Sequence, residues 1–347
     1  MASVADCDII IRLDANHSKG MGHLYRMLQV AEGLKNRKRS VCFTGRINNA
    51  SRRMLTDSRY RVIAFDDTTP EKEIIEQTFK EWNNPSLWLY DILDTQPEWI
   101  HMVQDQRIRI MCIDDCGAGI ANADEVILML PCKFMHLEPA RLSSNVKYGI
   151  KYMILPPELD RYSRSRKPSA KQSFRIGVSM GGSDTHGSTV RIAEALNRTV
   201  GNITSVDFYT GLSFRHHREL AAVVQQAAYP GVIHKNVPNL HQQLDMLDIV
   251  ITGGGMTLFE TARMGLPILA FANESFEKDN IRYLADRKAC MDLGSINEMS
   301  SRELYLTLCE FISTHNRFAE MSQNARELMI FSGRTYILNR IEAYCRV

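Results

Sequence analysis

The stretch LHQQLDMLDIVITGGGMTLFETARMGLPILAF, residues 240–271, decides the fold class. An apolar, β-branched run enters three consecutive glycines, and a helical pattern follows from Met256 or Thr257. Gly265 and Pro267 then end that helix and lead to a second apolar run, as a C-cap glycine with a following proline commonly does. The order strand, glycine loop, helix, strand predicts one βαβ unit of a parallel sheet.

The same alternation extends along the chain on both sides of this stretch. The apolar runs of the first half are DIIIRL, SVCFTG, RVIAFD, LWLYDI, IRIMCID and EVILML, and those of the second are FRIGVSMGG, SVDFYTG, VIHKN, IVITGGG and PILAFA. Helices are predicted between them, for example over residues 22–36, 187–199 and 257–265, and in the tail over 301–346. Because 347 residues exceed the roughly 250–300 that one core supports, we expect two Rossmann-like α/β domains with an interdomain cleft.

The boundary between the two domains is expected in a polar, basic and proline-bearing stretch, PPELDRYSRSRKPSAKQS. This composition is typical of an exposed connection, so the predicted linker covers residues 156–173. The first domain is then residues 1–155, and the second is residues 174–330. The basic residues of the stretch would also suit a nucleic-acid patch, but a solvated linker explains them more simply.

Composition narrows the class of protein. Lys and Arg total 42 and Asp and Glu total 40, a balance that gives no bulk electrostatic argument for a nucleic-acid partner. The eight cysteines lack metal-ligand spacing and are interpreted as reduced thiols of a cytoplasmic protein. The N-terminal residues lack the pattern of a signal peptide, and no apolar run reaches the length of a membrane span.

The glycine run is the strongest chemical signal. Gly253, Gly254 and Gly255 between a strand and a helix let the backbone approach a diphosphate, with the helix dipole directed at it. Glu260 is predicted on the first turn of that helix, where a carboxylate can accept two hydrogen bonds from a ribose diol. The alternative is a purely structural glycine turn with a glutamate that the dipole favours.

A second signal follows the first predicted strand, in RLDANHSKGMGHLYR, residues 12–26. Gly20 and Gly22 would expose backbone N–H groups at a helix N-terminus, a seat for an anionic or strongly polar ligand. His23 would lie in the first helical turn, with Arg26 one turn later as a candidate substrate contact. The positive end of the helix dipole disfavours protonation of an imidazole there, which suits a general base. The alternative is a tight turn with an ordinary histidine near the helix cap.

A third, weaker signal is VSMGGSDTHGSTVRIAEAL, residues 178–196. A buried strand ends at Gly181 and Gly182, and an amphipathic helix starts near Ser188. This is typical of the first strand-to-helix turn of a Rossmann-like domain, although a glycine pair also serves a simple chain reversal. Gly182 is therefore included among the candidate ligand contacts.

These motifs resemble one family. The run RLDANHSKGMGHLYR is similar to its Arg-x-Asp and Gly-x-Gly-His-x-x-Arg pattern, and residues 236–269 resemble its nucleotide-binding half. That group is the PseG/SpsG-like UDP-sugar hydrolases, related to MurG-type glycosyltransferases of the GT-B fold. The segments CIDDCGAGIANADEVI and KYGIKYMILPPEL fall where this family has similar segments, so the resemblance covers roughly residues 8–290.

The resemblance implies a GT-B fold whose terminal helix, residues 331–347, returns to the first domain. It implies inverting hydrolysis of a UDP-linked amino-deoxy sugar, for nonulosonic acid or surface polysaccharide biosynthesis, with UDP as the leaving group. His23 would activate the water, and Asp14 would support this histidine or a sugar hydroxyl. The backbone of residues 253–255 with Thr257 would stabilise the diphosphate, so that no metal and no cofactor is needed. No obligatory protein partner is implied.

Two departures from the family pattern affect the predicted sugar site. Relatives often carry an Asn-Gln pair facing the sugar where this chain reads NESFEKDN, so Glu277 or Asn280 is expected there, with Asn273 as a further possibility. Met256 replaces the more usual serine or threonine. Two alternatives to the hydrolase stay open: a glycosyltransferase using a UDP-amino sugar donor, and a non-catalytic nucleotide-sugar-binding protein.

Overall fold

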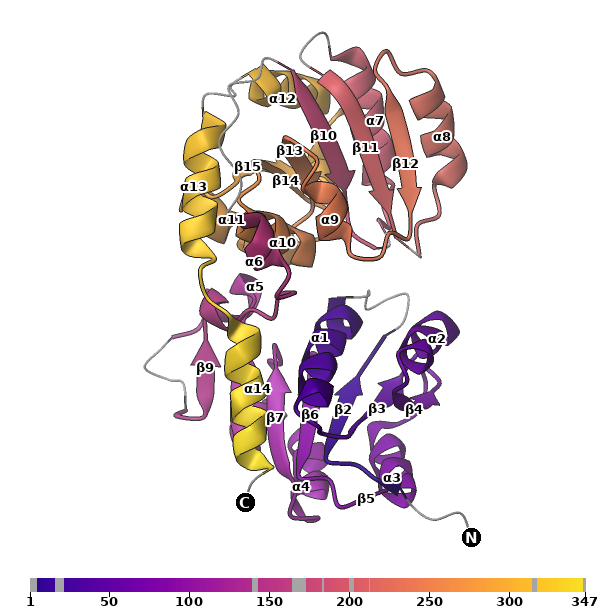
Figure 1. The fold of residues 1–347 in the computed structure, drawn as a ribbon, viewed down its shortest axis with the longest axis vertical. Helices are drawn as coiled ribbons and strands as arrows, with labels where there is room; N and C mark the ends of the chain where they lie inside the picture. The colour runs from indigo at the N-terminus through magenta and orange to yellow at the C-terminus, as the bar shows by residue number, and fades with distance from the viewer. Residues whose placement is uncertain are drawn as a thin grey trace. The chain divides into compact units, whose positions relative to one another are not determined.

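Two large parallel sheets, each with its own helices, dominate the described part of the chain (Figure 1). The computed structural model describes residues 5–15, 22–138, 143–163, 173–182, 184–199, 203–211, 213–313 and 317–345. The chain divides into two compact units, one formed by Met1–Leu155 with Phe331–Val347 and the other by Pro156–Ile330. No helix of the described residues is long and apolar enough to cross a membrane.

The first unit holds a seven-stranded parallel sheet in the order β4-β3-β2-β6-β7-β8-β9. Its strands are β2 (Ile9–Leu13), β3 (Val41–Arg46), β4 (Arg61–Phe65), β6 (Leu87–Asp91), β7 (Arg109–Ile113), β8 (Glu125–Leu128) and β9 (Val146–Tyr148). A two-stranded sheet pairs β1 (Ala5–Asp6) with β5 (Trp82–Asn83). Its helices are α1 (Gly22–Asn36), α2 (Asn49–Asp57), α3 (Glu71–Glu81), α4 (Pro97–Gln104), α5 (Pro131–Phe134) and α14 (Gly333–Tyr344), with 3-10 turns η1 (Ala118–Asn122) and η3 (Ile150–Tyr152).

The second unit holds a six-stranded parallel sheet in the order β12-β11-β10-β13-β14-β15. The strands are β10 (Phe174–Ser179), β11 (Ile203–Thr210), β12 (Gly231–Lys235), β13 (Ile249–Thr252), β14 (Ile268–Ala272) and β15 (Met291–Ser295). The helices are α6 (Leu159–Ser163), α7 (Ser188–Arg198), α8 (His217–Gln225), α9 (Leu240–Leu244), α10 (Met256–Met264), α11 (Glu277–Ala285), α12 (Ser301–Ser313) and α13 (Phe318–Leu328), with the 3-10 turn η4 (Ile296–Glu298).

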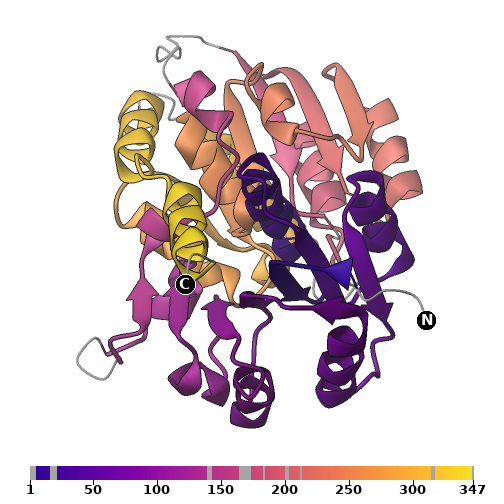
Figure 2. The ribbon, with the colours of Figure 1, turned by 60° about the horizontal axis from the view of Figure 1, so that its bottom comes forward.

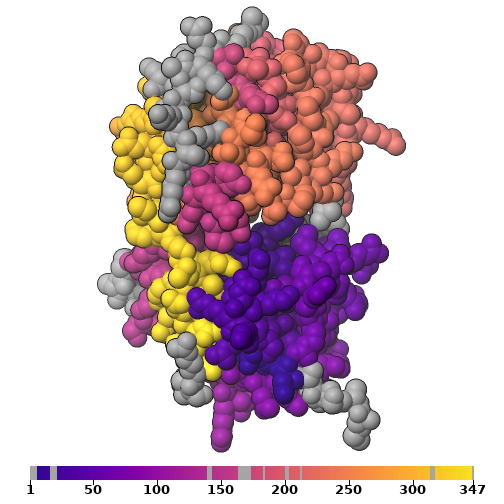
Figure 3. All heavy atoms as spheres, viewed as in Figure 1, coloured from indigo at the N-terminus to yellow at the C-terminus, as the bar shows by residue number. Residues whose placement is uncertain are grey.

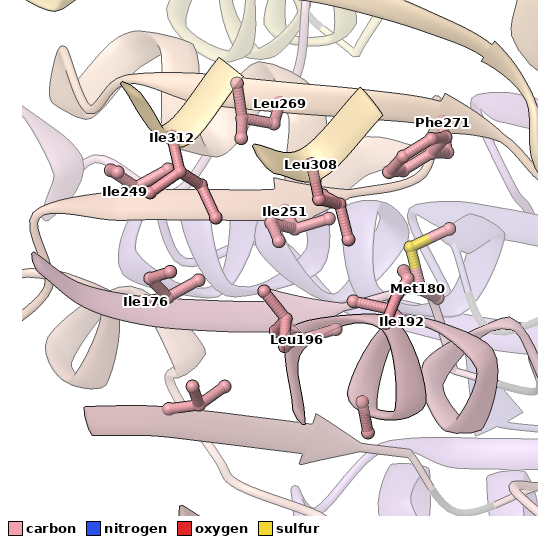
Figure 4. Close-up of a cluster of buried hydrophobic side chains, with 14 of the residues drawn as sticks. Ile176, Met180, Ile192, Leu196, Ile249, Ile251, Leu269, Phe271, Leu308 and Ile312 are labelled. Atoms are coloured by element: carbon pink, nitrogen blue, oxygen red, sulfur yellow. The ribbon is translucent and has the colours of Figure 1, made fainter. Parts of the chain in front are cut away.

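Burial on both faces explains why the central strands read as continuous apolar runs. Every residue of β2, β6, β13 and β14 is buried, as expected of parallel strands covered by helices on both sides. Figure 4 shows one face of the second sheet, where strand residues such as Ile176 and Ile251 gather with Leu196 of α7 and Leu308 of α12. Each such buried side chain contributes roughly 1.5–3 kcal/mol.

The last helix, α14, packs on the first unit, against α1 and η3. Figures 2 and 3 show this yellow segment at the C-terminal end of the chain, and in Figure 3 its atoms touch the indigo atoms of α1. Its anchor is the carboxylate of Glu125, which is 2% exposed and accepts hydrogen bonds from Tyr336 (3.2 Å), Arg340 (2.8 Å) and Tyr344 (3.0 Å). The first unit is therefore built from both ends of the sequence.

The stretch predicted as a linker contains a short helix. Residues 159–163 form α6, Leu159 is fully buried, and α6 packs against α10. Asp160 accepts a hydrogen bond at 3.0 Å from Nε of Arg263 on α10. The beginning of the predicted linker is thus part of the second unit.

Candidate active site

In each sheet the strand order reverses at one place, and several candidate residues follow the strands on either side of it. In the first sheet β2 lies between β3 and β6, and in the second β10 lies between β11 and β13. Open α/β sheets bind ligands at this switch point, beyond the carboxyl ends of the strands. His23 follows β2 and Asp91 ends β6, whereas Gly182 follows β10 and residues 253–255 follow β13.

His23 is held by a carboxylate that the sequence prediction missed. Its Nδ1 lies 2.7 Å from Oδ1 of Asp91, which is fully buried, while the histidine side chain is 14% exposed. Nη2 of Arg26, a donor only, lies 3.1 Å from the same Nδ1. The shorter contact with an acceptor assigns the proton to Nδ1, because a carboxylate oxygen must receive it. In the neutral imidazole Nε2 then carries the lone pair, which is the state a general base requires.

Arg26 is buried and does not lie where a substrate contact was predicted from the sequence. The guanidinium is 4% exposed and lies between two buried carboxylates, donating to both oxygens of Asp91 and to Oδ2 of Asp114 at 2.5 Å. Oδ1 of Asp114 also accepts the N–H groups of Met129 and Leu130. Arg26 therefore ties α1 to the ends of β6 and β7 from within the protein.

The ion pairs fix the charge of Asp91. Burial by itself would raise the pKa of this carboxyl, but the charges of Arg26 and His23 and their hydrogen bonds outweigh it and hold the pKa at about 2. Asp91 is consequently a carboxylate at neutral pH. A permanent carboxylate beside Nδ1 keeps the imidazole in one orientation and stabilises the positive charge that it acquires on taking a proton.

Asp14 lies in a separate cluster and makes no contact with His23 among the described residues. Its carboxylate accepts a hydrogen bond from Arg12 at 2.6 Å and from Nη1 of Arg46 at 3.3 Å, while Arg12 also pairs with Glu71. Burial raises the pKa of Asp14, but the charge of Arg12 more than offsets this and lowers it. The carboxylate that pairs with His23 is thus Asp91 and not Asp14. A contact of Asp14 with a sugar hydroxyl stays a prediction.

The glycines of the first motif are only partly described. Gly20 lies outside the described residues, so its predicted role stays a prediction. Gly22 is the first residue of α1, which puts His23 in the first turn of that helix, as predicted.

Two glycine loops of the second unit lead into α7 and α10, and among the described residues the two helix N-termini differ in what caps them. At α7, the carboxylate of Asp184 accepts the N–H groups of Ser188 and Thr189, each at 2.8 Å. At α10, Gly255 is the N-cap and no described side chain caps the helix. A carboxylate of the protein therefore occupies the N-terminus of α7, and a diphosphate at the N-terminus of α10 stays a prediction.

Gly182 lies in the loop before α7, and its backbone is used by the protein itself. Its carbonyl accepts the N–H of Ser213 at 3.3 Å, and a Cβ added at Gly211 would lie only 2.4 Å from the carbonyl oxygen of Gly182. The pair of glycines lets two loops approach each other. A ligand contact at Gly182 stays a prediction.

Glu260 is a carboxylate without a described hydrogen-bond or charge partner. It is the fifth residue of α10, so it lies on the second turn and not on the first as predicted. The residue is half-buried, and burial raises its pKa to about 7. A poorly solvated carboxylate near an open helix N-terminus suits a ligand that donates hydroxyl hydrogen bonds, and Thr257 lies one turn earlier on the same helix face.

Glu277 and Asn280 do not face outward as the sugar contacts that the sequence predicted. They are 8% and 1% exposed, and both turn toward backbone: Glu277 accepts the N–H of Asn273 at 2.8 Å, and Asn280 donates to the carbonyl of Gly254 at 2.9 Å. Asn273 is also buried and accepts a hydrogen bond from Ser188 at 2.6 Å. These side chains shape the loops of the candidate site from inside the protein.

The part of the chain that the structure describes contains no evident metal site. No group of three or more His, Cys, Asp or Glu side chains there is arranged to hold a metal ion.

Comparisons with known proteins agree with this architecture. No protein-family model matches the chain. The chain is 24% identical, over 91% of its length and 92% of the relative, to the spore coat polysaccharide biosynthesis protein SpsG of Bacillus subtilis. The structure of MurG from Acinetobacter baumannii matches 97% of this chain and 99% of its own with a TM-score of 0.70 at 14% identity. The complex of Staphylococcus aureus MnaA with UDP matches 98% and 97% with a TM-score of 0.64 at 11% identity.

The fold is therefore the two-sheet α/β fold of GT-B proteins, as the sequence predicted. Within that class the chain is similar to SpsG over most of its length, and the predicted resemblance to PseG/SpsG-like proteins is confirmed.

Proposed function

We propose that this protein hydrolyses a UDP-linked amino-deoxy sugar with inversion at the sugar C1, for surface polysaccharide or nonulosonic acid biosynthesis. The observation that carries the proposal is the contact of Nδ1 of His23 with the buried carboxylate of Asp91, at the switch point of the first sheet. The name of SpsG, a protein of polysaccharide biosynthesis, and the UDP in the MnaA complex support this substrate class.

The proposed reaction follows from these groups. Water donates a proton to Nε2 of His23 as its oxygen attacks C1, the bond from C1 to the diphosphate oxygen breaks, and UDP leaves with the electron pair. The open N–H groups at the start of α10 would receive the diphosphate, and Glu260 would accept hydrogen bonds from the ribose. Asp91 compensates the positive charge on the imidazole during the step.

The second candidate is transfer of the same sugar to an acceptor hydroxyl, which the fold shared with MurG favours. The same base would then take the proton of the acceptor.

The test is incubation with a panel of UDP-amino-deoxy sugars in buffer that contains EDTA, followed by NMR. We expect equimolar UDP and free sugar, with the first-formed sugar of inverted anomeric configuration. Water labelled with ¹⁸O should appear at C1 of the sugar and not in UDP. Turnover only after an acceptor is added would establish the transferase, and binding without turnover of any panel member would contradict both enzymatic proposals. Loss of activity in EDTA would contradict the metal-independent mechanism.

Changing Glu260 to glutamine should have opposite effects on stability and on ligand binding. A half-buried carboxyl whose pKa burial raises to about 7 disfavours the folded state once it ionises. This destabilisation is absent below the unfolded pKa near 4.5, grows as the pH rises, and is complete above 7. The variant should gain up to about 3 kcal/mol of unfolding free energy at pH 8 and none near pH 4.

Binding of UDP to the same variant should weaken by roughly 1–3 kcal/mol at pH 8, the scale of hydrogen bonds to a charged group. Wild-type affinity should increase as the pH rises through 7, since the carboxylate is the better acceptor. Calorimetry and thermal melts measure both effects, with Glu194→Gln, an exposed carboxylate on α7, as the control. Unchanged UDP affinity in Glu260→Gln would remove the ribose assignment.

A further inference from the structure

The buried network around Arg26 contains a second carboxylate, which the proposed reaction does not use. Asp114 directly follows β7 and is fully buried, and its Oδ2 accepts a hydrogen bond from Nη1 of Arg26 at 2.5 Å. Its Oδ1 accepts the N–H groups of Met129 at 2.7 Å and Leu130 at 3.1 Å, which follow β8. Both carboxylate oxygens are therefore held, and Nη1 of the guanidinium is held with them.

The backbone at Asp114 has an unusual conformation. Its φ is +50°, in the left-handed region that few residues other than glycine adopt. Such a conformation persists only where the surrounding contacts hold it, and it is common at functional sites. The contacts of this carboxylate with Arg26 and with the chain after β8 are such a hold.

Arg26 and His23 compete for one oxygen of Asp91. Oδ1 of Asp91 accepts a hydrogen bond from Nη2 of Arg26 and lies 2.7 Å from Nδ1 of His23, while Nη2 lies 3.1 Å from the same Nδ1. A neutral imidazole has one donor and one acceptor nitrogen, so two arrangements fit these contacts. With the proton on Nδ1, the ring donates to Asp91 and Nε2 carries the lone pair. With the proton on Nε2, Nδ1 accepts from Arg26.

The charges of this cluster decide between the two arrangements. Burial alone would lower the pKa of Arg26, but the charges of Asp91 and Asp114 outweigh it and raise the pKa, so the guanidinium stays positive. A positive group beside Nδ1 favours a lone pair on that nitrogen and disfavours a proton there, and the effect is strong away from water. Two carboxylates compensate the guanidinium more completely than Asp91 alone could, which favours the proton on Nδ1.

We propose that Asp114 is a positioning residue of the candidate active site. It holds the guanidinium of Arg26 and compensates its charge, so that the neutral ring of His23 donates from Nδ1 and keeps its lone pair on Nε2. This inference rests on the proposed function, because the lone pair matters for the reaction only if His23 is the base. The location of the ring proton can nevertheless be measured without a substrate.

Nitrogen-15 NMR of the histidine rings measures where the proton lies. The spectra are recorded without ligand, at increasing pH until the ring of His23 is neutral, and its signals are identified by their absence in His23→Asn. The wild type should carry the proton mainly on Nδ1. Asp114→Asn should raise the population with the proton on Nε2 by about tenfold, because an amide leaves the guanidinium less compensated. A wild-type proton mainly on Nε2, or an unchanged ratio in the variant, would overturn the inference.

Arg26 gives a readout in the wild type that does not depend on the folding of a variant. A guanidinium that Asp114 holds at Nη1 and Asp91 holds at Nη2 cannot rotate freely, so its Nη protons should give separate NMR signals. A single averaged signal would contradict the proposed hold.

Kinetics on a confirmed substrate separate positioning from general stability. Asp114→Asn should lower turnover by about tenfold and leave the affinity for UDP within about twofold, since only the state of the base changes. In the His23→Asn background the same substitution should cost nothing further, because Asp114 acts through the imidazole. An equal loss in both backgrounds would make this carboxylate merely structural.

The matched control is Asp115→Asn. Asp115 is also fully buried, and its Oδ1 accepts two backbone N–H groups, from Thr95 at 3.1 Å and Gly117 at 2.8 Å. In the described part of the chain it has no hydrogen bond to Arg26, so its substitution should change neither the proton location nor turnover. A shift in the control as large as that in Asp114→Asn would show that the contact with Arg26 is not the cause.

The inference and the proposed function fail in different ways. A protein that turns over no UDP-sugar removes the proposed function, whereas the proton location in His23 and its response to Asp114→Asn still decide the role of Asp114 in the network. Confirmed turnover that depends on His23, together with an Asp114→Asn variant that changes neither the proton location nor the rate, would remove only the role of Asp114.

Discussion

Replacing His23 by asparagine should lower the turnover of a UDP-sugar substrate by about 10²- to 10⁴-fold, the usual contribution of a positioned general base. Asparagine can still donate a hydrogen bond to Asp91, so the local packing should survive, but it cannot take a proton from water near neutral pH. UDP affinity should stay within about twofold of the wild type, because the proposed nucleotide contacts belong to the second unit. Steady-state kinetics and calorimetry measure the two quantities.

A control variant separates the loss of the base from any general effect of replacing a histidine by asparagine. The matched control is His101→Asn, an exposed histidine on α4 of the same unit. Near wild-type turnover of His23→Asn on a confirmed substrate would make this histidine structural and place the base elsewhere.

The second large effect is expected at Asp91. In Asp91→Asn the amide can offer its own N–H to Nδ1, which favours the tautomer with the proton on Nε2 and removes the lone pair that water needs. The compensating negative charge is lost as well. Turnover should fall by about 10²- to 10⁴-fold, close to the loss in the His23 variant.

The Asp91 variant also breaks a buried ion pair with Arg26, which typically costs about 3–5 kcal/mol. Thermal melts should therefore accompany the kinetics, and the assays should be run well below the melting temperature. A double variant separates the two consequences: His23→Asn with Asp91→Asn should be no slower than His23→Asn alone, because the carboxylate acts through the imidazole. An additive loss of activity would show that Asp91 acts independently of the histidine.

The fold class followed from the sequence because the signals are local. Runs such as DIIIRL and IVITGGG predict buried parallel strands, and between them apolar residues recur at helical spacing. The order of strands in a sheet is not local. Asp91 ends a predicted strand, but only the placement of β6 beside β2 brings it to His23, from 68 residues away. The family resemblance implies support of the histidine or of a sugar hydroxyl by Asp14, and this carboxylate lies with Arg12 and not with His23.

Side-chain direction is the other property that the sequence left open. Glu277 and Asn280 are polar residues three apart on a helix that starts beside a glycine loop, which fits an outward sugar contact as well as an inward grip on backbone. Burial decides between the two, and burial depends on how α11 packs on β14 and β15. A buried polar residue without an obvious partner in the sequence is thus best interpreted only after the backbone groups around it are known.

The position of α14 has a consequence for synthesis on the ribosome. The first unit includes residues 331–347, and the carboxylate of Glu125 that anchors α14 has its partners at positions 336, 340 and 344. When Leu155 is made, the whole second unit must still be translated before these partners exist, a delay of roughly 10–40 s at 5–20 residues per second. The unit that begins first is therefore completed after the second, and the nascent chain carries an exposed α1 surface until residues 333–344 are made.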